Sequence, residues 1–298
     1  MEINIFQVDA FSKVPFGGNP AGVVTNSKKL NDKQMQRIAN EMNLSETAFI
    51  NQMEDGYFKI RYFTPLLEVD LCGHATIASI YTLASEGFIT PIQKGVKTVI
   101  IETKAGKLNV DIEYNNYLPK NIIMAQKTPQ SLGVPELIMD ILDAFGLEEA
   151  DIGIGDKYIS PEIISTGLPD IIFPIKDKKK LVNMKVDFCK IAEISRKLNV
   201  TGVHAFYIKD RMSRIAYARN FAPIVGIDEE AATGTANGAL IYYLKKNDLL
   251  AEDSLVVSQG DSMGRPSQIN CRIENSDGGY SVFVGGEANI VIEGIIKF

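Results

Sequence analysis

The sequence predicts an α+β protein built from two similar halves. Length and composition allow this, since 298 residues with 45% hydrophobic content suffice for two cores of roughly 100 to 150 residues each. The stronger observation is that one order of segments occurs twice along the chain. The first of these segments, MEINIFQVDAF, alternates polar and apolar residues and is expected to be a β-strand.

The clearest repeat begins at Arg61 and again at Arg219. The first copy reads RYFTPLLEVDLCGHATIAS and the second reads RNFAPIVGIDEEAATGTANGA. Each copy has Arg, any residue, Phe, any residue and Pro, then an acidic loop, then Gly-x-Ala-x-x-Ala opening a run of helix-forming residues. The acidic loop of the second copy is three residues longer.

The repeat extends to both sides of this motif. Residues 31–43 and 187–199 have equal length, apolar residues at helical spacing and an N-cap residue at the start. Further matches pair residues 18–24 with 167–173 and residues 107–113 with 268–274.

Agreement in this order predicts two domains of similar fold. We expect an N-terminal half of residues 1–117 and a C-terminal half of residues 118–287. The closing segment, residues 288–298, has no match in the second copy and is expected to cross back to the first half. Ligands tend to bind between such halves.

Composition and charge narrow the possible partners. The formal net charge is −6 and Lys and Arg are scattered, so the chain offers no basic face for nucleic acid. No segment approaches the roughly 20 apolar residues of a membrane-spanning helix. Three widely spaced cysteines indicate neither a disulfide framework nor a zinc site. A small molecule is the expected partner, and the cytoplasm the expected location.

Two glycines, Gly73 and Gly234, stand at matching helix starts. The first amides of a helix lack internal partners and lie at the positive end of the helix dipole, so they bind anions. Either glycine alone is explained by a tight turn. Two matched copies predict instead that both helix starts bind one ligand, a small carboxylic acid.

The differences between the copies place the chemistry in the first half. Cys72 aligns with Thr233, His74 with Thr235, and Glu46 with Val203. Glu46 lies among apolar residues, where desolvation would raise its pKa toward a range useful for proton transfer.

Each candidate also has a structural explanation. Glu46 would otherwise be a solvated glutamate on an edge strand. His74 is a proton shuttle or substrate donor, or else a core or capping histidine. Cys72 is a nucleophile or base, or else a small buried apolar residue.

Expectations also follow for four further residues. His204 is expected to be structural. Glu229 and Glu230, in the longer acidic loop, either face the ligand or are solvated. Glu68 is expected to face solvent.

The motifs resemble a known family. FGGNPAGVV, SETAF, RYFTPLLEVDLCGHAT, RNFAP, ATGTANGAL and QGDSMGRPS occur in the order found in the phenazine-biosynthesis isomerase-like family, relatives of trans-2,3-dihydro-3-hydroxyanthranilate isomerase. The resemblance covers essentially the whole chain. It implies the diaminopimelate epimerase fold, with two pseudo-symmetric domains, each a sheet wrapped around a central helix. It also implies a homodimer and proton transfer without a cofactor or metal.

The resemblance assigns roles to individual residues. Glu46 matches the catalytic acid/base, and Asn19 and Ser45 match substrate contacts. Gly73, His74, Gly234 and Thr235 match the helix starts that bind the substrate carboxylate. Glu230 stands where the family isomerase has Asp, and the Pro that follows this Asp is Ala231 here.

The expected reaction is isomerisation of a small carboxylic acid by acid/base catalysis. Glu46, His74 and Glu230 are the predicted catalytic residues. The predicted substrate-binding residues are Asn19, Ser45, Cys72, Gly73, Thr233, Gly234 and Thr235. Three alternatives stay open: a racemase or epimerase of an amino acid-like substrate that uses Cys72, a metabolite-binding protein without turnover, and a scaffold.

Overall fold

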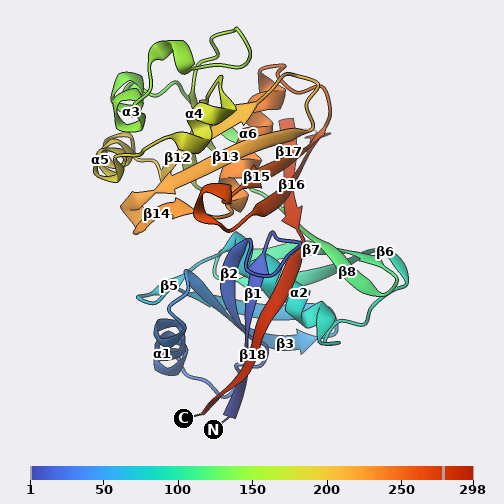
Figure 1. Ribbon diagram of the computed structural model, residues 1–298. Helices are drawn as coiled ribbons and strands as arrows, with labels where there is room; N and C mark the ends of the chain where they lie inside the picture. The colour runs from blue at the N-terminus through green and yellow to red at the C-terminus, as the bar shows by residue number, and fades with distance from the viewer. Residues whose placement is uncertain (1, 277–278, 298) are drawn as a thin grey trace. The chain divides into compact units, whose positions relative to one another are not determined.

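The structure, a computed structural model, describes residues 2–276 and 279–297. The chain divides into two compact units, a first unit of Met1–Ala125 with Gly285–Phe298 and a second unit of Gln126–Val284 (Figure 1). Each unit combines a mixed sheet with helices, which confirms the predicted α+β class. Among the described residues, no helix is both long and apolar enough to span a lipid bilayer.

The first unit holds a mixed sheet of strand order β18-β1-β2-β3-β4-β6-β7-β8. The neighbours β2 and β3, and β4 and β6, are parallel; the other neighbours are antiparallel, and β5 pairs with β4. The strands are β1 (Glu2–Ala10), β2 (Asn19–Val24), β3 (Glu46–Glu54), β4 (Tyr57–Phe63), β5 (Glu68–Val69), β6 (Lys94–Thr103), β7 (Gly106–Asn115), β8 (Leu118–Ala125) and β18 (Ala288–Lys297).

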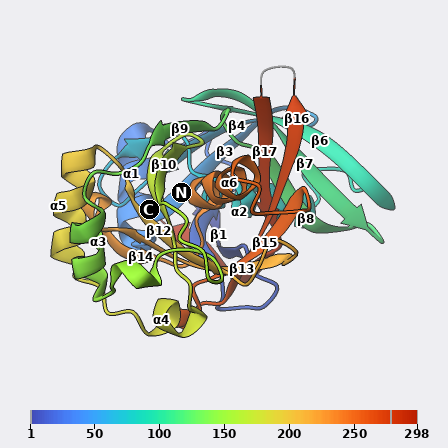
Figure 2. The ribbon, with the colours of Figure 1, turned by 90° about the horizontal axis from the view of Figure 1, so that it is seen from above.

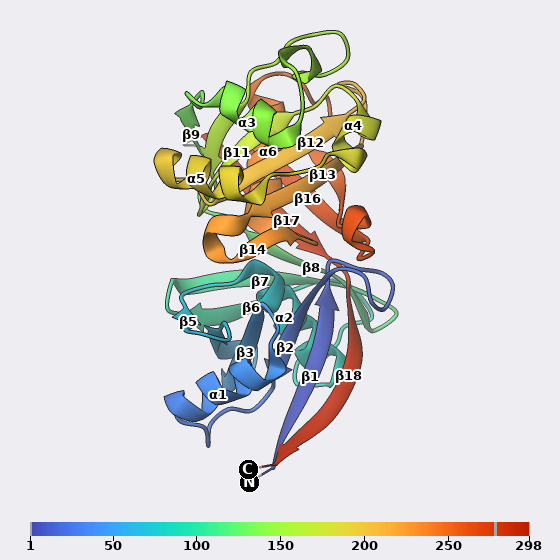
Figure 3. The ribbon, with the colours of Figure 1, turned by 60° about the vertical axis from the view of Figure 1, so that its left-hand side comes forward.

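Two strands set the limits of the first unit. Strand β8 is antiparallel to β7, so this unit runs to Ala125, whereas the sequence analysis ended the first half at residue 117. Strand β18 is antiparallel to β1 along nearly its whole length, and Figure 3 shows the two side by side. The last strand of the chain thus completes the sheet that the first strand begins.

Helix α2 (Gly73–Ser85) is the central helix of the first unit and packs against β1, β2, β3, β8 and β18. Its residues are small or apolar on every side, as expected for a helix surrounded by its own sheet. The buried hydroxyls of Thr76, Ser79 and Thr82 donate to backbone carbonyls one turn earlier, at 2.6–2.8 Å. These bonds satisfy the hydroxyls within α2 itself, and Thr76 Oγ1 also lies 2.7 Å from the Tyr62 hydroxyl of β4.

Helix α1 (Asp32–Met42) covers the other face of this sheet. It begins with a capping box in which Asn31 and Gln34 bond to each other's backbone. Met35 and Ile38, the buried stripe predicted from the sequence, pack against Phe49 and Phe63 of the sheet.

The second unit holds a mixed sheet of order β9-β10-β11-β12-β13-β15-β16, with β14 paired to β13. The neighbours β11 and β12, and β13 and β15, are parallel and the others antiparallel. The strands of this unit are β9 (Gln130–Gly133), β10 (Glu162–Ser165), β11 (Pro169–Pro174), β12 (Gly202–Ile208), β13 (Ile215–Ala222), β14 (Ile227–Glu230), β15 (Ser254–Gln259), β16 (Ser267–Ser276) and β17 (Gly279–Gly286).

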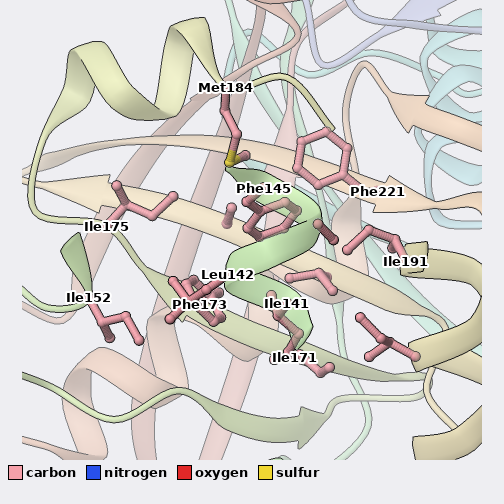
Figure 4. Packing of buried hydrophobic residues seen from close by; sticks show 14 of the residues in the cluster. Ile141, Leu142, Phe145, Ile152, Ile171, Phe173, Ile175, Met184, Ile191 and Phe221 are labelled. Atoms are coloured by element: carbon pink, nitrogen blue, oxygen red, sulfur yellow. The ribbon is translucent and has the colours of Figure 1, made fainter. Parts of the chain in front are cut away.

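Helix α6 (Gly234–Lys246) is the central helix here and packs against β10, β11, β15 and β16. The outer face of the sheet carries α3 (Ile138–Phe145), α4 (Lys178–Asn183) and α5 (Phe188–Leu198). Figure 2 shows α3 and α5 side by side. The core between these helices and the sheet includes Phe145, whose ring packs edge-on against Phe173 and at a tilt against Phe221 (Figure 4).

The two units repeat one order of elements. In the first unit β1-β2-α1-β3-β4-β5-α2-β6-β7-β8 corresponds to β10-β11-α5-β12-β13-β14-α6-β15-β16-β17 of the second. Strand β9, antiparallel to β10, takes the place that β18 takes beside β1. Each unit is therefore a sheet wrapped around a central helix, as predicted.

The strand register corrects one position of the sequence alignment. Arg61 is opposite Phe49, and its counterpart Arg219 is opposite Ala205. Counting back along β3 and β12, Glu46 corresponds to Gly202 and not to Val203, as the alignment had it. The shift matters because residues one apart on a strand point to opposite faces of the sheet.

Candidate active site

The first unit brings Glu46, His74, Cys72 and Asn19 together. Glu46 is the first residue of β3, while Cys72 is the N-cap and His74 the second residue of α2. Asn19 begins β2 and follows Gly18, whose φ of +65° and backbone packing against Ala10 leave no room for a side chain. The fold thus brings four side chains from three segments of the chain, β2, β3 and the start of α2, to one place.

Glu46 and His74 form the closest pair of titratable groups in this cluster. Glu46 Oε2 lies 3.2 Å from His74 Nε2, and the two side chains are 16% and 5% exposed. Burial lowers the pKa of His74, and the negative charge of Glu46 acts in the opposite direction. The imidazole is therefore neutral near pH 7.

The contacts of the other ring nitrogen, Nδ1, show which nitrogen of His74 carries the ring proton. Asn19 Nδ2 lies 3.3 Å from His74 Nδ1, and Cys72 Sγ lies 3.4 Å from the same atom. An amide nitrogen can only donate, so Nδ1 accepts and the ring proton is on Nε2, which faces Glu46. The arrangement is a carboxylate beside a neutral N–H donor.

The same cluster has the donor atoms of a metal site. One ligand atom each of Glu46, Cys72 and His74 lies within 4.8 Å of the others. Thiolate, imidazole and carboxylate are the ligands that zinc prefers. The geometry thus allows two kinds of chemistry, proton transfer or metal binding.

The remaining predicted residues of the first unit lie next to this cluster in the sequence. Gly73 is the first helical residue of α2, and a Cβ added to it would meet no atom within 4 Å. Neither its backbone angles nor packing therefore requires glycine at this position. Ser45 precedes Glu46 in the turn before β3 and is half-buried.

The second unit places Glu230 and Thr233 in contact. Glu230 ends β14, and Thr233 Oγ1 donates to Glu230 Oε2 at 2.6 Å. Gln259 Nε2 donates to Thr233 Oγ1 at 3.1 Å and to the Glu230 carbonyl at 2.7 Å. Thr233 is the N-cap of α6, followed by Gly234 and Thr235.

The starts of α2 and α6 have the same local structure. The N-cap residues Cys72 and Thr233 have φ/ψ of −138°/122° and −124°/119°, and no described side chain caps either helix. Neither first turn contains an acidic residue. Each helix thus keeps the positive end of its dipole uncompensated within its first turn, as an anion site requires.

His204 has the structural role expected from the sequence. Its ring is fully buried, with Nδ1 3.0 Å from Asn220 Oδ1 and Nε2 3.1 Å from Asn237 Oδ1. Asn237 in turn donates to Gln259 Oε1 at 2.8 Å and to the Thr233 carbonyl at 2.7 Å. This amide network holds the start of α6 and escaped the sequence analysis.

Replacing His204 with glutamine should change how stability depends on pH. Burial lowers the pKa of His204 to about 4, against 6.5 ordinarily, although hydrogen bonds to Asn220 and Asn237 oppose this. Below pH 6.5 the unfolded chain binds a proton that the folded protein does not, so the free energy of unfolding falls as pH drops toward 4. The loss is about 3 kcal/mol. Denaturant unfolding at a series of pH values measures it as the difference between wild type and H204Q. An identical pH dependence in both proteins would contradict the assignment.

Glu68 and Glu229 of the acidic loops form ion pairs with arginines, which the sequence analysis did not predict. Arg61 donates to both carboxylate oxygens of Glu68 at 2.7 and 2.9 Å. This ion pair, with Lys104, holds the pKa of Glu68 down at about 2 against the effect of burial, so Glu68 is not the solvent-facing group expected. Arg219 likewise donates to both carboxylate oxygens of Glu229, at 2.9 and 2.8 Å, which gives Glu229 a structural role.

The chain is similar to known proteins along almost its whole length. The family model described as phenazine biosynthesis-like protein, PhzC-PhzF, matches residues 8–294. An uncharacterized isomerase from Clostridium acetobutylicum is 34% identical over 97% of this chain and 96% of its own length.

Solved structures agree with this assignment. The crystal structure of a Bacillus anthracis phenazine biosynthesis protein of the PhzF family has a TM-score of 0.85 and 28% identity, with both chains fully covered. The crystal structure of a hydroxyproline epimerase from Agrobacterium vitis has a TM-score of 0.61 at 12% identity, covers 99% of this chain and 92% of its own, and shows the shared fold.

Fold and sequence thus define an isomerase-type enzyme with the predicted epimerase-like architecture. The chain belongs to the phenazine biosynthesis-like protein family, PhzC-PhzF.

Proposed function

We propose that this enzyme isomerises a small carboxylic acid by moving a proton, without a cofactor. The proposal is carried by one observation, the buried carboxylate oxygen of Glu46 that lies 3.2 Å from His74 Nε2 beside the uncapped start of α2. Glu46 Oε2 is buried and has no hydrogen bond of good geometry to any described residue. Such an oxygen can accept a proton from a substrate carbon.

Each predicted site residue of the first unit has a role in the proposed reaction. Glu46 removes a proton from a C–H bond of the substrate and returns it to another carbon. The amides at Gly73 and His74 bind the substrate carboxylate and stabilise charge that develops as the proton leaves. Asn19 and Cys72 fix the ring of His74, and Ser45 contacts the substrate.

We propose that Glu230 of the second unit is also a catalytic residue, and that Thr233, Gly234 and Thr235 bind substrate. The Thr233 hydroxyl orients the Glu230 carboxylate through its 2.6 Å hydrogen bond. Gly234 and Thr235 stand at the start of α6, which no described side chain caps, like the start of α2. Glu230 is one methylene longer than the family aspartate, so we propose a substrate that differs in size from that of the family isomerase.

Ligand screening followed by isotope exchange tests the proposal. Thermal shifts with cyclic and amino carboxylates identify ligands, because a ligand that binds only the folded state raises its melting temperature. Each ligand is then incubated in deuterated buffer and followed by NMR for a positional isomer. Turnover should persist after dialysis against a chelator. Turnover lost on chelation and restored by zinc would overturn the proposal in favour of a metal site at Glu46, Cys72 and His74.

Cys72→Ala separates this reaction from two-thiol racemisation. A racemase needs a second thiol on the opposite face of the carbon, and the counterpart of Cys72 is Thr233, whose hydroxyl scarcely ionises near neutral pH. We expect the variant to keep turnover to within about tenfold, since Cys72 only positions His74. Steady-state kinetics of the variant, and of the wild type after thiol alkylation, measure the turnover that remains. Complete loss in both experiments, with deuterium at a stereocentre, would favour a racemase.

We also propose that the protein is a homodimer and acts in the cytoplasm. Analytical ultracentrifugation and cell fractionation test these two points.

A further inference from the structure

The cluster of Glu46, Cys72 and His74 holds one donor atom more than proton transfer requires. One ligand atom of each residue lies within 4.8 Å of the other two. A carboxylate and an imidazole suffice to move a proton, and the proposed reaction uses the sulfur of Cys72 only to position the His74 ring. A sulfur beside an imidazole and a carboxylate is also a ligand for borderline metal ions such as zinc.

The distances between the donor atoms fit one zinc ion. Tetrahedral zinc, with bonds of about 2.0–2.1 Å to nitrogen and oxygen and about 2.3 Å to sulfur, places nitrogen and oxygen about 3.3 Å apart and nitrogen and sulfur about 3.6 Å apart. Glu46 Oε2 lies 3.2 Å and Cys72 Sγ 4.0 Å from His74 Nε2. The first distance needs no change, and the second needs the sulfur to move by only about 0.4 Å.

Burial and charge also suit a divalent cation. Cys72 is 9% exposed, and the side chains of His74 and Glu46 are 5% and 16% exposed. A thiolate of Cys72 and the carboxylate of Glu46 together carry two negative charges, which neutralise Zn²⁺ in a place that water barely reaches. Glu46 Oε2 has no hydrogen bond of good geometry to any described residue, so the metal ion satisfies a buried oxygen.

Asn19 supports the site from outside the three donors. Its amide lies 3.3 Å from His74 Nδ1, the ring nitrogen that the metal does not use. A histidine that binds zinc through Nε2 carries its proton on Nδ1 and donates it to an acceptor. Turning the Asn19 amide over presents its oxygen in place of its nitrogen, so the same contact orients the ring in both states.

We propose that Zn²⁺ binds reversibly to Glu46 Oε2, Cys72 Sγ and His74 Nε2 and inhibits the enzyme. Binding breaks the S–H bond of Cys72 and the Nε2–H bond of His74; the thiol proton goes to solvent, and the ring regains its proton at Nδ1. Water takes the fourth position, unlike in the closed four-ligand sites of structural zinc, so the ion remains exchangeable. The inhibition rests on the proposed function, since the carboxylate of Glu46, once bonded to zinc, cannot take a proton from substrate.

Metal titrations test the site without any substrate. Protein freed of metal by dialysis against a chelator is titrated with Co²⁺, which replaces zinc and absorbs in the near ultraviolet when a thiolate binds it. The band should saturate at one Co²⁺ per chain and vanish when Zn²⁺ is added, whereas Mg²⁺, which prefers oxygen ligands, should not compete. A wild-type protein that binds neither Co²⁺ nor Zn²⁺ overturns the proposal, whichever variants fold.

Variants identify the ligands. Cys72→Ala should lose the cobalt–thiolate band, and His74→Gln should weaken zinc binding by more than the roughly 100-fold that loss of an outer partner costs at most. Asn19→Asp, whose carboxylate can only accept from Nδ1, should tighten zinc binding by about tenfold. Cys189→Ala is the matched control, because this thiol is exposed and can bind metal adventitiously. A band that persists in C72A, or that disappears in C189A, overturns the site.

Inhibition of turnover tests the consequence. With a carboxylate that the enzyme isomerises, saturating Zn²⁺ should lower turnover by about 10²- to 10⁴-fold, as loss of the Glu46 base would. The midpoint should equal that of zinc binding, and a chelator should restore turnover. Zinc that binds and leaves turnover unchanged, or raises it, overturns the inhibition. Zinc binding without turnover of any screened carboxylate supports the site and refutes the proposed reaction, whereas turnover without zinc binding refutes the site alone.

Discussion

Replacing Glu46 with glutamine should lower turnover by about 10²- to 10⁴-fold, the usual contribution of a general acid/base. Glutamine keeps the size of the side chain and can still contact His74, but its amide cannot accept and return a proton. Binding of the carboxylate, which depends on the helix start at Gly73, should remain. Steady-state kinetics and calorimetric binding measure the two effects separately.

The control for this experiment is Glu54→Gln, at the exposed end of the same strand. It removes one negative charge from β3 without touching the cluster, so its turnover should equal that of the wild type. An E46Q enzyme with wild-type turnover would remove Glu46 from the mechanism. Loss of binding together with turnover would mean that Glu46 recognises the ligand and does not transfer a proton.

Replacing Phe145 with alanine should lower the free energy of unfolding by about 3–5 kcal/mol. Its ring is 2% exposed and lies 5.7 and 5.6 Å from the rings of Phe173 and Phe221. Truncation leaves a cavity between α3 and the outer face of the sheet that these rings cannot fill (Figure 4). Urea unfolding, monitored by circular dichroism, measures the loss.

Met139→Ala on the same helix is the matched control. This side chain is 63% exposed, so its loss should change stability by less than about 0.5 kcal/mol. Similar unfolding midpoints for F145A and M139A would show that the outer core contributes little to the stability of the second unit.

The architecture of each unit could be predicted because the same order of segments occurs twice in the sequence. The motif at Arg61 and Arg219 marks the same strand, loop and helix start in both units, and the N-caps Asn31 and Asp187 mark the same outer helix. Helix caps and helix starts depend on only a few neighbouring residues, so they can be recognised in a sequence. Together with the family resemblance they led to Glu46 and His74, which the fold brings within 3.2 Å.

Features that depend on strand register could not be predicted. The alignment paired Glu46 with Val203 because an Ala-Phe pair recurs after both, and only the ladder with β4 and β13 shows that Gly202 is its counterpart. The expectation that Glu68 faces solvent is wrong because Arg61, on the neighbouring strand β4, pairs with it, and the sequence pattern does not show this ion pair.

The burial of Asp170, which is 2% exposed, was not predicted, although the sequence around it contains a signal. In GLPDIIFP it is a charged residue in an otherwise apolar strand, which predicts either an exposed edge or a buried group with a special role. Only the strand order, with β11 flanked on both sides, excludes the edge.

The pairing of β1 with β18 has a consequence for biosynthesis. The ribosome releases the first 125 residues long before it makes the strand that covers the outer edge of β1, so that edge stays open while the contiguous second unit emerges and folds. We therefore expect truncation of the C-terminus to destabilise the first unit, and a nascent chain stalled before residue 288 to be a chaperone substrate.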